Sequence, residues 1–228
     1  VAKLHEYCEA TYICHTIVSG GSPSEIESLM ADQIGEIREN HDSSKAREGL
    51  VKQYKLTKTF NQQKNTPLTE SDYKDILKEA SFSNGQGHLI LRNKMYSDIN
   101  EAFAIAGGNI MEPQLFHSKI KSPKSAQLEH ILPVAPKKWG TPWVDVSGTP
   151  TDEHGRYYTR IGNMTLLDVN TNSIIKNNIW SKKKPFYLVN DQPLMTREIG
   201  NNTAWSQTEI DARGAKLVDF IAAKWWIF

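Results

Sequence analysis

The sequence predicts an α+β fold that is mainly helical and contains a small antiparallel pair of strands followed by a helix. Roughly the first hundred residues carry apolar side chains at helical spacing. From Gln127 to Leu167 the chain breaks into short apolar runs separated by proline, glycine and aspartate. The C-terminal segment then returns to a helical pattern. With 228 residues, of which 39% are hydrophobic, the chain can bury a substantial core.

Helices dominate the expected N-terminal part. They are expected over residues 4–18, 25–40, 45–54, 70–80 and 89–106. Thr69, three residues before Asp72, matches a capping box at the start of the fourth helix. Gly85 and Gly87 are expected to break the chain before the fifth. This part is interpreted as a helical support.

Two strands and a helix are expected next. The strand candidates are residues 128–134 and 156–167, whose aliphatic and aromatic content suits an antiparallel pair. A turn-rich connection, residues 141–155, separates them. One helix is expected over residues 170–184, with Asn170 or Thr171 as its N-cap.

The C-terminal segment is expected to form a helix that packs back on the helical support. Ser206, three residues before Glu209, is the expected N-cap, and the helix is expected over residues 210–226. The predicted division is therefore a support (1–112), a central core (113–190) and a C-terminal helical segment (191–228) in one compact domain. Because the chain begins at Val1, we expect it to be a fragment of a longer protein.

Charge is distributed unevenly. The net charge is +1, yet residues 1–114 carry −4 and residues 115–190 carry +6. Neutralising phosphates is the main sequence-independent contribution to nucleic-acid binding, so the basic middle predicts a DNA or RNA contact surface. No apolar run approaches the roughly 18 residues of a membrane helix, and no signal peptide is evident, so a cytoplasmic location is expected. Two cysteines without a CxxC pair exclude a disulfide framework and a cysteine-ligated zinc site.

Four residues of the basic middle suggest metal-assisted hydrolysis of a phosphodiester. His130 is the candidate general base, because an imidazole titrates near neutral pH. Glu129, its neighbour in a strand, points to the opposite side and is a candidate metal ligand. Asn172 supplies a neutral oxygen that can complete the shell of Mg²⁺ or Mn²⁺. Asn163 can hydrogen-bond either the loop or the imidazole, and in the second case it would orient the base.

These motifs resemble a known family. The segments EHILP (129–133) and IGNMTLL (161–167), followed by NSIIKN (172–177), Trp180 and Lys183, resemble the C-terminal nuclease domain of GmrSD-type restriction endonucleases. That domain is similar to the His-Asn-His (ββα-metal) nucleases and also occurs in SspE-type phage-defence proteins. The resemblance covers about residues 125–187.

The resemblance implies a set of site residues and a function. It assigns Glu129, His130, Asn163 and Asn172 to the active site, and Asn177 and Lys183 to phosphate contact. Lys182 and Arg160 are further candidates for nucleic-acid contact. The implied activity is cleavage or nicking of phage DNA by a domain whose N-terminal nucleotide-hydrolysing partner domain is not in this sequence. Glutamate stands here where the broader nucleases more often have aspartate, and asparagine where they often have a metal-binding histidine, and both changes keep oxygen ligands.

Several other interpretations stay open at this level. His154 is more simply a turn residue than a second base. Trp139, Trp143 and Trp180 are more simply core residues than base-stacking platforms. An alternative function is a nucleic-acid binding or partner-docking module with a decayed site. An RNase with the same site is a further alternative, since water attacking phosphorus need not distinguish the two sugars.

Overall fold

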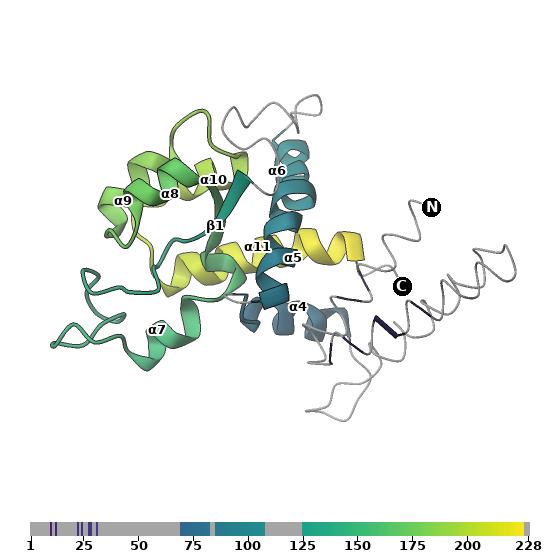
Figure 1. Cartoon of the computed structure of the whole chain (residues 1–228), viewed down its shortest axis with the longest axis horizontal. Helices are drawn as coiled ribbons and strands as arrows, with labels where there is room; N and C mark the ends of the chain where they lie inside the picture. The colour runs from purple at the N-terminus through teal and green to yellow at the C-terminus, as the bar shows by residue number, and fades with distance from the viewer. Residues whose placement is uncertain are drawn as a thin grey trace, which may run out of the picture. The chain divides into compact units, whose positions relative to one another are not determined.

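A computed structural model describes residues 69–82, 85–107 and 125–225, together with isolated positions before residue 32 (Figure 1). The helices expected over residues 4–18, 25–40 and 45–54 fall, apart from those isolated positions, outside the described residues. The chain divides into two compact units, Val1–Ala80 with Ile221–Phe228, and Ser81–Phe220. None of the helices in the described ranges combines the length and apolar character needed to cross a membrane.

In the first unit, helix α4 (Glu70–Glu79) confirms the expected capping box. The Asp72 backbone N–H donates to Thr69 Oγ1 at 3.1 Å, and the Thr69 N–H donates to Asp72 Oδ2 at 3.1 Å. Two orphan amides at the start of the helix are thus satisfied. Tyr73 and Leu77, four residues apart, form its buried face.

The second unit begins with one continuous helical run. It consists of α5 (Gly85–Lys94), a π-helical segment η2 (Met95–Ile99) and α6 (Asn100–Ala106). Gly85 was expected to interrupt the chain before a helix at residue 89, but the helix begins at Gly85. Leu91, Met95 and Ile99 recur every four residues on its buried face.

The expected antiparallel strand pair is confirmed, with a shorter second strand. β1 (Ala126–His130) pairs with β2 (Met164–Asp168), so that Glu129 faces Thr165 and His130 faces Met164. The residues predicted to begin the second strand instead form α7 (Asp152–Tyr157) and a 3-10 turn, η4 (Ile161–Asn163). Thr151 caps α7 by accepting a hydrogen bond from the His154 N–H, which favours helix there.

The single helix expected over residues 170–184 is two helices in the structure. α8 (Val169–Ile175) is capped by Asp168, whose carboxylate accepts from the Thr171 N–H at 3.0 Å, so the predicted caps Asn170 and Thr171 were wrong. Lys176 ends α8 with φ 40°, and α9 (Trp180–Tyr187) follows.

Three further elements follow along the chain. They are α10 (Leu194–Arg197), the 3-10 turn η5 (Glu198–Asn201) and α11 (Gln207–Trp225), of which the residues up to Phe220 belong to the second unit. The expected Ser206 cap is present, because Ser206 Oγ accepts from the Thr208 N–H at 3.2 Å and Glu209 Oε2 accepts from the Ser206 N–H at 2.7 Å. Figure 1 shows α8, α9 and α10 grouped together near β1.

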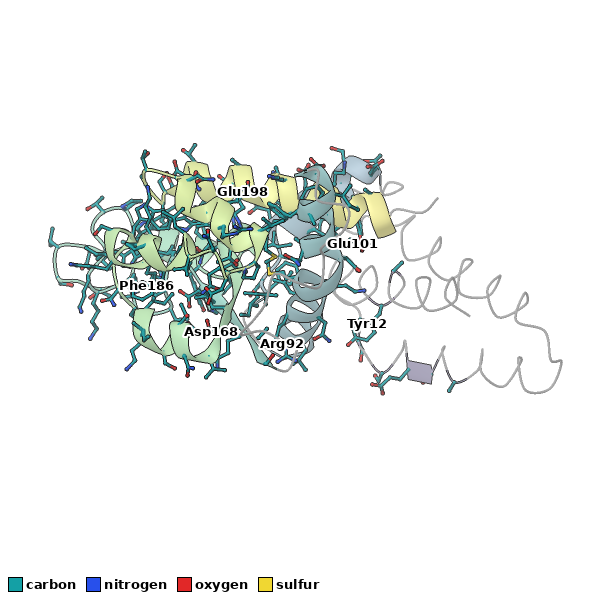
Figure 2. All side chains as sticks on the ribbon, turned by 90° about the horizontal axis from the view of Figure 1, so that it is seen from above. Tyr12, Arg92, Glu101, Asp168, Phe186 and Glu198 are labelled. Carbon is teal, nitrogen blue, oxygen red and sulfur yellow. The ribbon has the colours of Figure 1, made fainter. Side chains whose placement is uncertain are left out.

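The core of the second unit lies around the strands and α11, and side chains fill this interior (Figure 2). Trp139 and Trp143 are buried in it, which confirms the core interpretation for these two, whereas Trp180 is only partly buried and packs against it. Gly162 lies so close to α11 that an added Cβ would stand 2.0 Å from the Ile210 carbonyl oxygen. Arg213 of α11 donates to the carbonyls of Gly162 and Met164 at 3.0 and 2.6 Å. Helix α11 therefore fixes the start of β2.

Candidate active site

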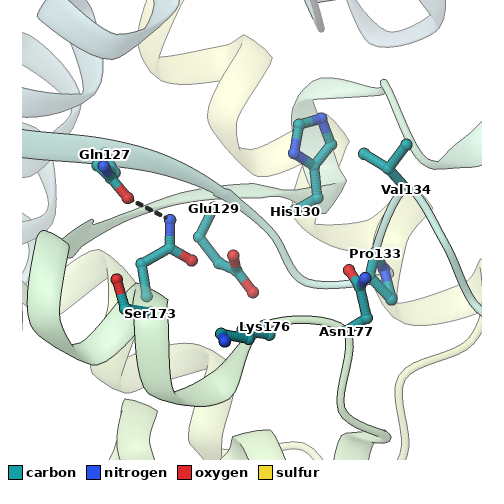
Figure 3. A pocket seen from close by; sticks show the side chains of 9 residues that line it. Gln127, Glu129, His130, Pro133, Val134, Ser173, Lys176 and Asn177 are labelled. Atoms are coloured by element: carbon teal, nitrogen blue, oxygen red, sulfur yellow. Dashed lines mark hydrogen bonds between the residues drawn. The ribbon is translucent and has the colours of Figure 1, made fainter.

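A pocket of about 370 Å³ opens at the C-terminal end of β1 (Figure 3). Its wall combines β1, the loop that follows β1, the C-terminal half of α8 and the loop after α8. The lining residues are Gln127, Glu129, His130, Pro133, Val134, Asn172, Ser173, Lys176 and Asn177. The structure thus brings four of the predicted site residues together: Glu129, His130, Asn172 and Asn177.

The alternation of β1 separates the acid from the imidazole. Gln127 and Glu129, two residues apart, project from one face of the strand, and Figure 3 shows the His130 ring on the opposite side from the Glu129 carboxylate. His130 is the last residue of β1. A substrate that meets both groups must therefore lie across the end of the strand.

Two residues of α9 bind the carboxylate of Glu129. It is 5% exposed, and its Oε1 accepts hydrogen bonds from Lys183 Nζ at 2.5 Å and from the Tyr187 hydroxyl at 3.2 Å. Neither group donates to Oε2. Lys183 Nζ also donates to the backbone carbonyl of His130 at 2.8 Å. One buried ammonium therefore fixes both the carboxylate and the end of β1.

Burial shifts the protonation equilibria of this cluster. It raises the pKa of Glu129 above the ordinary 4.5, an effect opposed by the charge and hydrogen bond of Lys183. Burial also lowers the pKa of Lys183, which the Glu129 carboxylate opposes. The pKa of Tyr187 is raised well above 10, first by burial and then by the neighbouring carboxylate. Each charge of the ion pair therefore depends on the other to stay ionised inside the protein.

The structure does not support the predicted phosphate contact of Lys183, because this side chain is completely buried. Successive residues of a helix point about 100° apart, so three lysines in a row on α9 cannot share one environment. Lys182 is exposed, and Lys184 donates to the Asn202 carbonyl at 2.9 Å. The role of Lys182 in nucleic-acid contact stays a prediction.

Asn163 lies at the end of η4, before the second strand rather than in it, and it binds the loop. Its Oδ1 accepts from the Leu132 N–H at 2.7 Å and from the Trp205 indole N–H at 3.0 Å. Its Nδ2 donates to the carbonyls of Leu132 and Tyr158, both at 2.9 Å. These four bonds use the full capacity of a side-chain amide. Of the two roles left open by the sequence, the structure therefore favours holding the loop after His130 over orienting the imidazole.

An aromatic ring, which the sequence did not indicate, lies beside the His130 imidazole. The Tyr158 ring is 6.0 Å from it at an interplanar angle of 30°, and His154 stacks on Tyr158 at 4.9 Å and 4°. His154 is buried in α7, with Nε2 2.9 Å from the Pro133 carbonyl oxygen. It is thus a packed helical residue, neither a second base nor the predicted turn residue.

Asn172 faces Gln127 across the pocket wall. Its Nδ2 donates to Gln127 Oε1 at 2.7 Å, which leaves the amide oxygen Oδ1 outside this bond. The sequence analysis did not select Gln127, although its position two residues before Glu129 in a strand placed it on the same face. Gln127 therefore sets the orientation of the Asn172 amide.

Arg160 is engaged within the protein. Its guanidinium donates to Asp211 Oδ1 at 3.0 Å and lies 4.0 Å above the Tyr157 ring, and its side chain is only 12% exposed. The predicted nucleic-acid contact of Arg160 is therefore not supported. Lys176, which the sequence analysis passed over, lines the pocket instead.

The pocket contains few groups that could bind a metal ion. In the described ranges, no three histidine, cysteine, aspartate or glutamate residues gather where they could hold a metal ion. The oxygen donors that line the pocket include the carboxylate of Glu129 and the amide of Asn172. Such a pair suits a hard cation that keeps several water or substrate ligands.

Comparison with known proteins identifies the family. Residues 36–220, a span that includes every residue lining the pocket, match the family described as GmrSD restriction endonucleases, C-terminal domain. Searches of curated proteins and of solved structures give no match to the chain. The matched span covers most of the chain and implies a nuclease domain of the restriction-endonuclease type. The chain therefore belongs to the family of C-terminal domains of GmrSD restriction endonucleases.

Proposed function

We propose that the chain is a metal-dependent DNA endonuclease or nickase of the HNH (ββα-metal) type. The observation that carries this proposal is the pocket at the end of β1, which Glu129, His130 and Asn172 line together. They come from the first strand and from the helix after the second strand, in the order strand, strand, helix. This is the order in which the sequence motifs predicted them.

Glu129 and Asn172 are the residues that would hold a Mg²⁺ or Mn²⁺ ion. The carboxylate is anchored through Oε1, and the amide nitrogen of Asn172 is occupied by Gln127, so each residue has an oxygen that these bonds leave for a cation. Bound there, the ion would polarise the phosphate and make a water easier to deprotonate. Hard cations of this kind accept one carboxylate when substrate oxygens and water supply the remaining ligands.

His130 is proposed to accept the proton of the attacking water. An imidazole suits this step because it exchanges protons near neutral pH. The Tyr158 ring lies 6.0 Å from the imidazole, and the Lys183 bond to the His130 carbonyl fixes the backbone of His130. Asn177, exposed at the pocket edge, is proposed to contact a phosphate oxygen of the substrate.

DNA is the proposed substrate, and phage DNA the proposed target. Support comes from the family, whose description names restriction endonucleases, and from the +6 charge of residues 115–190. We also propose that the protein is cytoplasmic and that it acts with a partner domain that hydrolyses nucleotides.

The decisive experiment is a nicking assay on supercoiled plasmid with Mg²⁺, Mn²⁺ or EDTA. We expect wild-type protein to convert plasmid to open-circular or linear DNA only with metal, and His130→Ala to lose at least about a hundredfold in rate, the low end for a general base. Thermal melting checks that the variant is folded. Metal-independent cleavage by His130→Ala would contradict the assignment. DNA retention without turnover by wild-type protein would indicate a binding module instead.

A further inference from the structure

Lys176 occupies an unusual position in the pocket wall. It follows α8 directly, lines the pocket between Ser173 and Asn177, and donates its backbone N–H to the Asn172 carbonyl at 3.1 Å (Figure 3). Its φ of 40° and ψ of −133° fall in a region that residues with a Cβ rarely adopt. Glycine would adopt this conformation without strain. Strained residues of this kind cluster at functional sites, where the surrounding structure holds them in place.

Within the part of the chain that the structure describes, no carboxylate neutralises the charge of Lys176. The side chain is exposed, and no carboxylate of the described residues forms an ion pair with it. Glu129, the acid in the pocket wall, is already paired with the buried Lys183. The ammonium of Lys176 is therefore left for an anion that enters the pocket.

Resting on the nuclease function proposed above, we propose that Lys176 binds a non-bridging phosphate oxygen of the substrate backbone. It takes the role that the sequence motifs suggested for Lys183. A lysine ammonium recognises phosphate as a point charge and reads no base, so this contact would strengthen binding equally on all sequences. The strained backbone conformation of Lys176 would be retained because it places a cation beside Asn172.

Three variants at one position separate this role from a purely structural one. Lys176→Met removes the charge, Lys176→Arg keeps it, and Lys176→Gly removes the side chain while relieving the backbone. Lys216→Met is the control for general charge, because it removes one positive charge away from the pocket, where Lys216 pairs with Glu198 at 2.8 Å. If Lys176 served only to end α8, Lys176→Gly would be at least as active as wild type.

The readouts are binding of a short DNA duplex in EDTA, by fluorescence anisotropy at several salt concentrations, and plasmid nicking with metal. One phosphate contact contributes a salt slope of about −0.9, so Lys176→Met should bind about eightfold more weakly at 0.1 M salt, with a slope shallower by about one. KM should rise more than kcat falls. Lys176→Arg should bind nearly as wild type, Lys216→Met as wild type, and Lys176→Gly should lose affinity while its melting temperature rises.

The outcomes distinguish this inference from the function on which it rests. If the wild type nicks plasmid but Lys176→Met binds and cuts as the wild type does, the role of Lys176 is refuted and the nuclease stands. If Lys216→Met weakens binding as much as Lys176→Met, the effect is one of general charge and the role is likewise refuted. If the wild type neither binds nor cuts DNA, the proposed function fails and this inference fails with it.

Discussion

Replacing Lys183 with methionine tests whether this lysine supports Glu129 or contacts DNA. The substitution keeps the length of the side chain but leaves the Glu129 carboxylate, 5% exposed, with only the Tyr187 hydroxyl as a side-chain donor. Breaking a buried ion pair by removing one partner costs about 3–5 kcal/mol. Taking up a proton limits this cost, because protonating a carboxyl with the ordinary pKa of 4.5 at pH 7 costs about 3 kcal/mol.

We therefore expect Lys183→Met to lose about 3 kcal/mol of unfolding free energy at pH 7, which lowers the melting temperature by about 6–12 °C in a chain of this size. The loss should shrink as pH falls towards 4.5. A buried carboxyl with a raised pKa favours the folded state while it is protonated, and this contribution is lost as pH rises through the folded pKa. Adding Glu129→Gln to Lys183→Met should recover much of the loss, since no carboxylate is then left unpaired.

The assay is urea and thermal unfolding of the two single variants, the double variant and a matched control. Lys184→Met is the control, because Lys184 is the next residue on α9 and its ammonium donates only to the Asn202 carbonyl. If Lys183→Met were as stable as Lys184→Met and lost only DNA affinity, Lys183 would be a phosphate contact after all. A double variant less stable than Lys183→Met would contradict the ion-pair argument.

Three further predictions follow from the geometry of the site. Gly162→Ala should destabilise the protein by at least about 2 kcal/mol in thermal melts, because its Cβ would meet the Ile210 carbonyl oxygen at 2.0 Å. Gly155→Ala, with open space around its Cβ, should be nearly neutral in the same melts. Asn163→Ala should lower the stability by about 2–4 kcal/mol, since four buried hydrogen bonds are lost. It should also lower kcat but leave DNA affinity, measured by anisotropy, nearly unchanged, because these bonds lie away from the substrate. Asn172→Ala should melt close to the wild type but need a severalfold higher Mg²⁺ concentration for half-maximal nicking; an unchanged metal requirement would remove Asn172 from the ligand set.

The sequence was informative where local rules determine structure. The capping residues Thr69 and Ser206 and the strand pair around Glu129 followed from short-range patterns. Helix α7 was missed because Tyr157 and Tyr158 suggested a strand. Thr151, followed by two acidic residues, already indicated a helix start.

At the site, the environment of each side chain depends on tertiary packing, which short-range patterns do not reveal. A run of three lysines does not reveal which one faces inward, because that depends on how α9 packs against β1. Nothing in the residue type of Lys176 predicts a positive φ, so the end of α8 could not be located from sequence. For Asn163, the choice between loop and imidazole required the tertiary structure.

Lys183 and Asn163 hold the backbone that follows Glu129, and in this way they can affect catalysis without contacting a substrate. The His130 carbonyl accepts from Lys183, the Ile131 N–H donates to the Asn163 carbonyl at 3.0 Å, and both backbone groups of Leu132 bind the Asn163 amide. Three consecutive residues at the end of β1 are thus held by partners 31 to 53 positions away. A loop with so few free backbone groups cannot shift without breaking buried hydrogen bonds, so His130 and Glu129 keep their relative positions before any substrate arrives. Damage to Lys183 or Asn163 should therefore reduce the rate of cleavage more than the affinity for DNA.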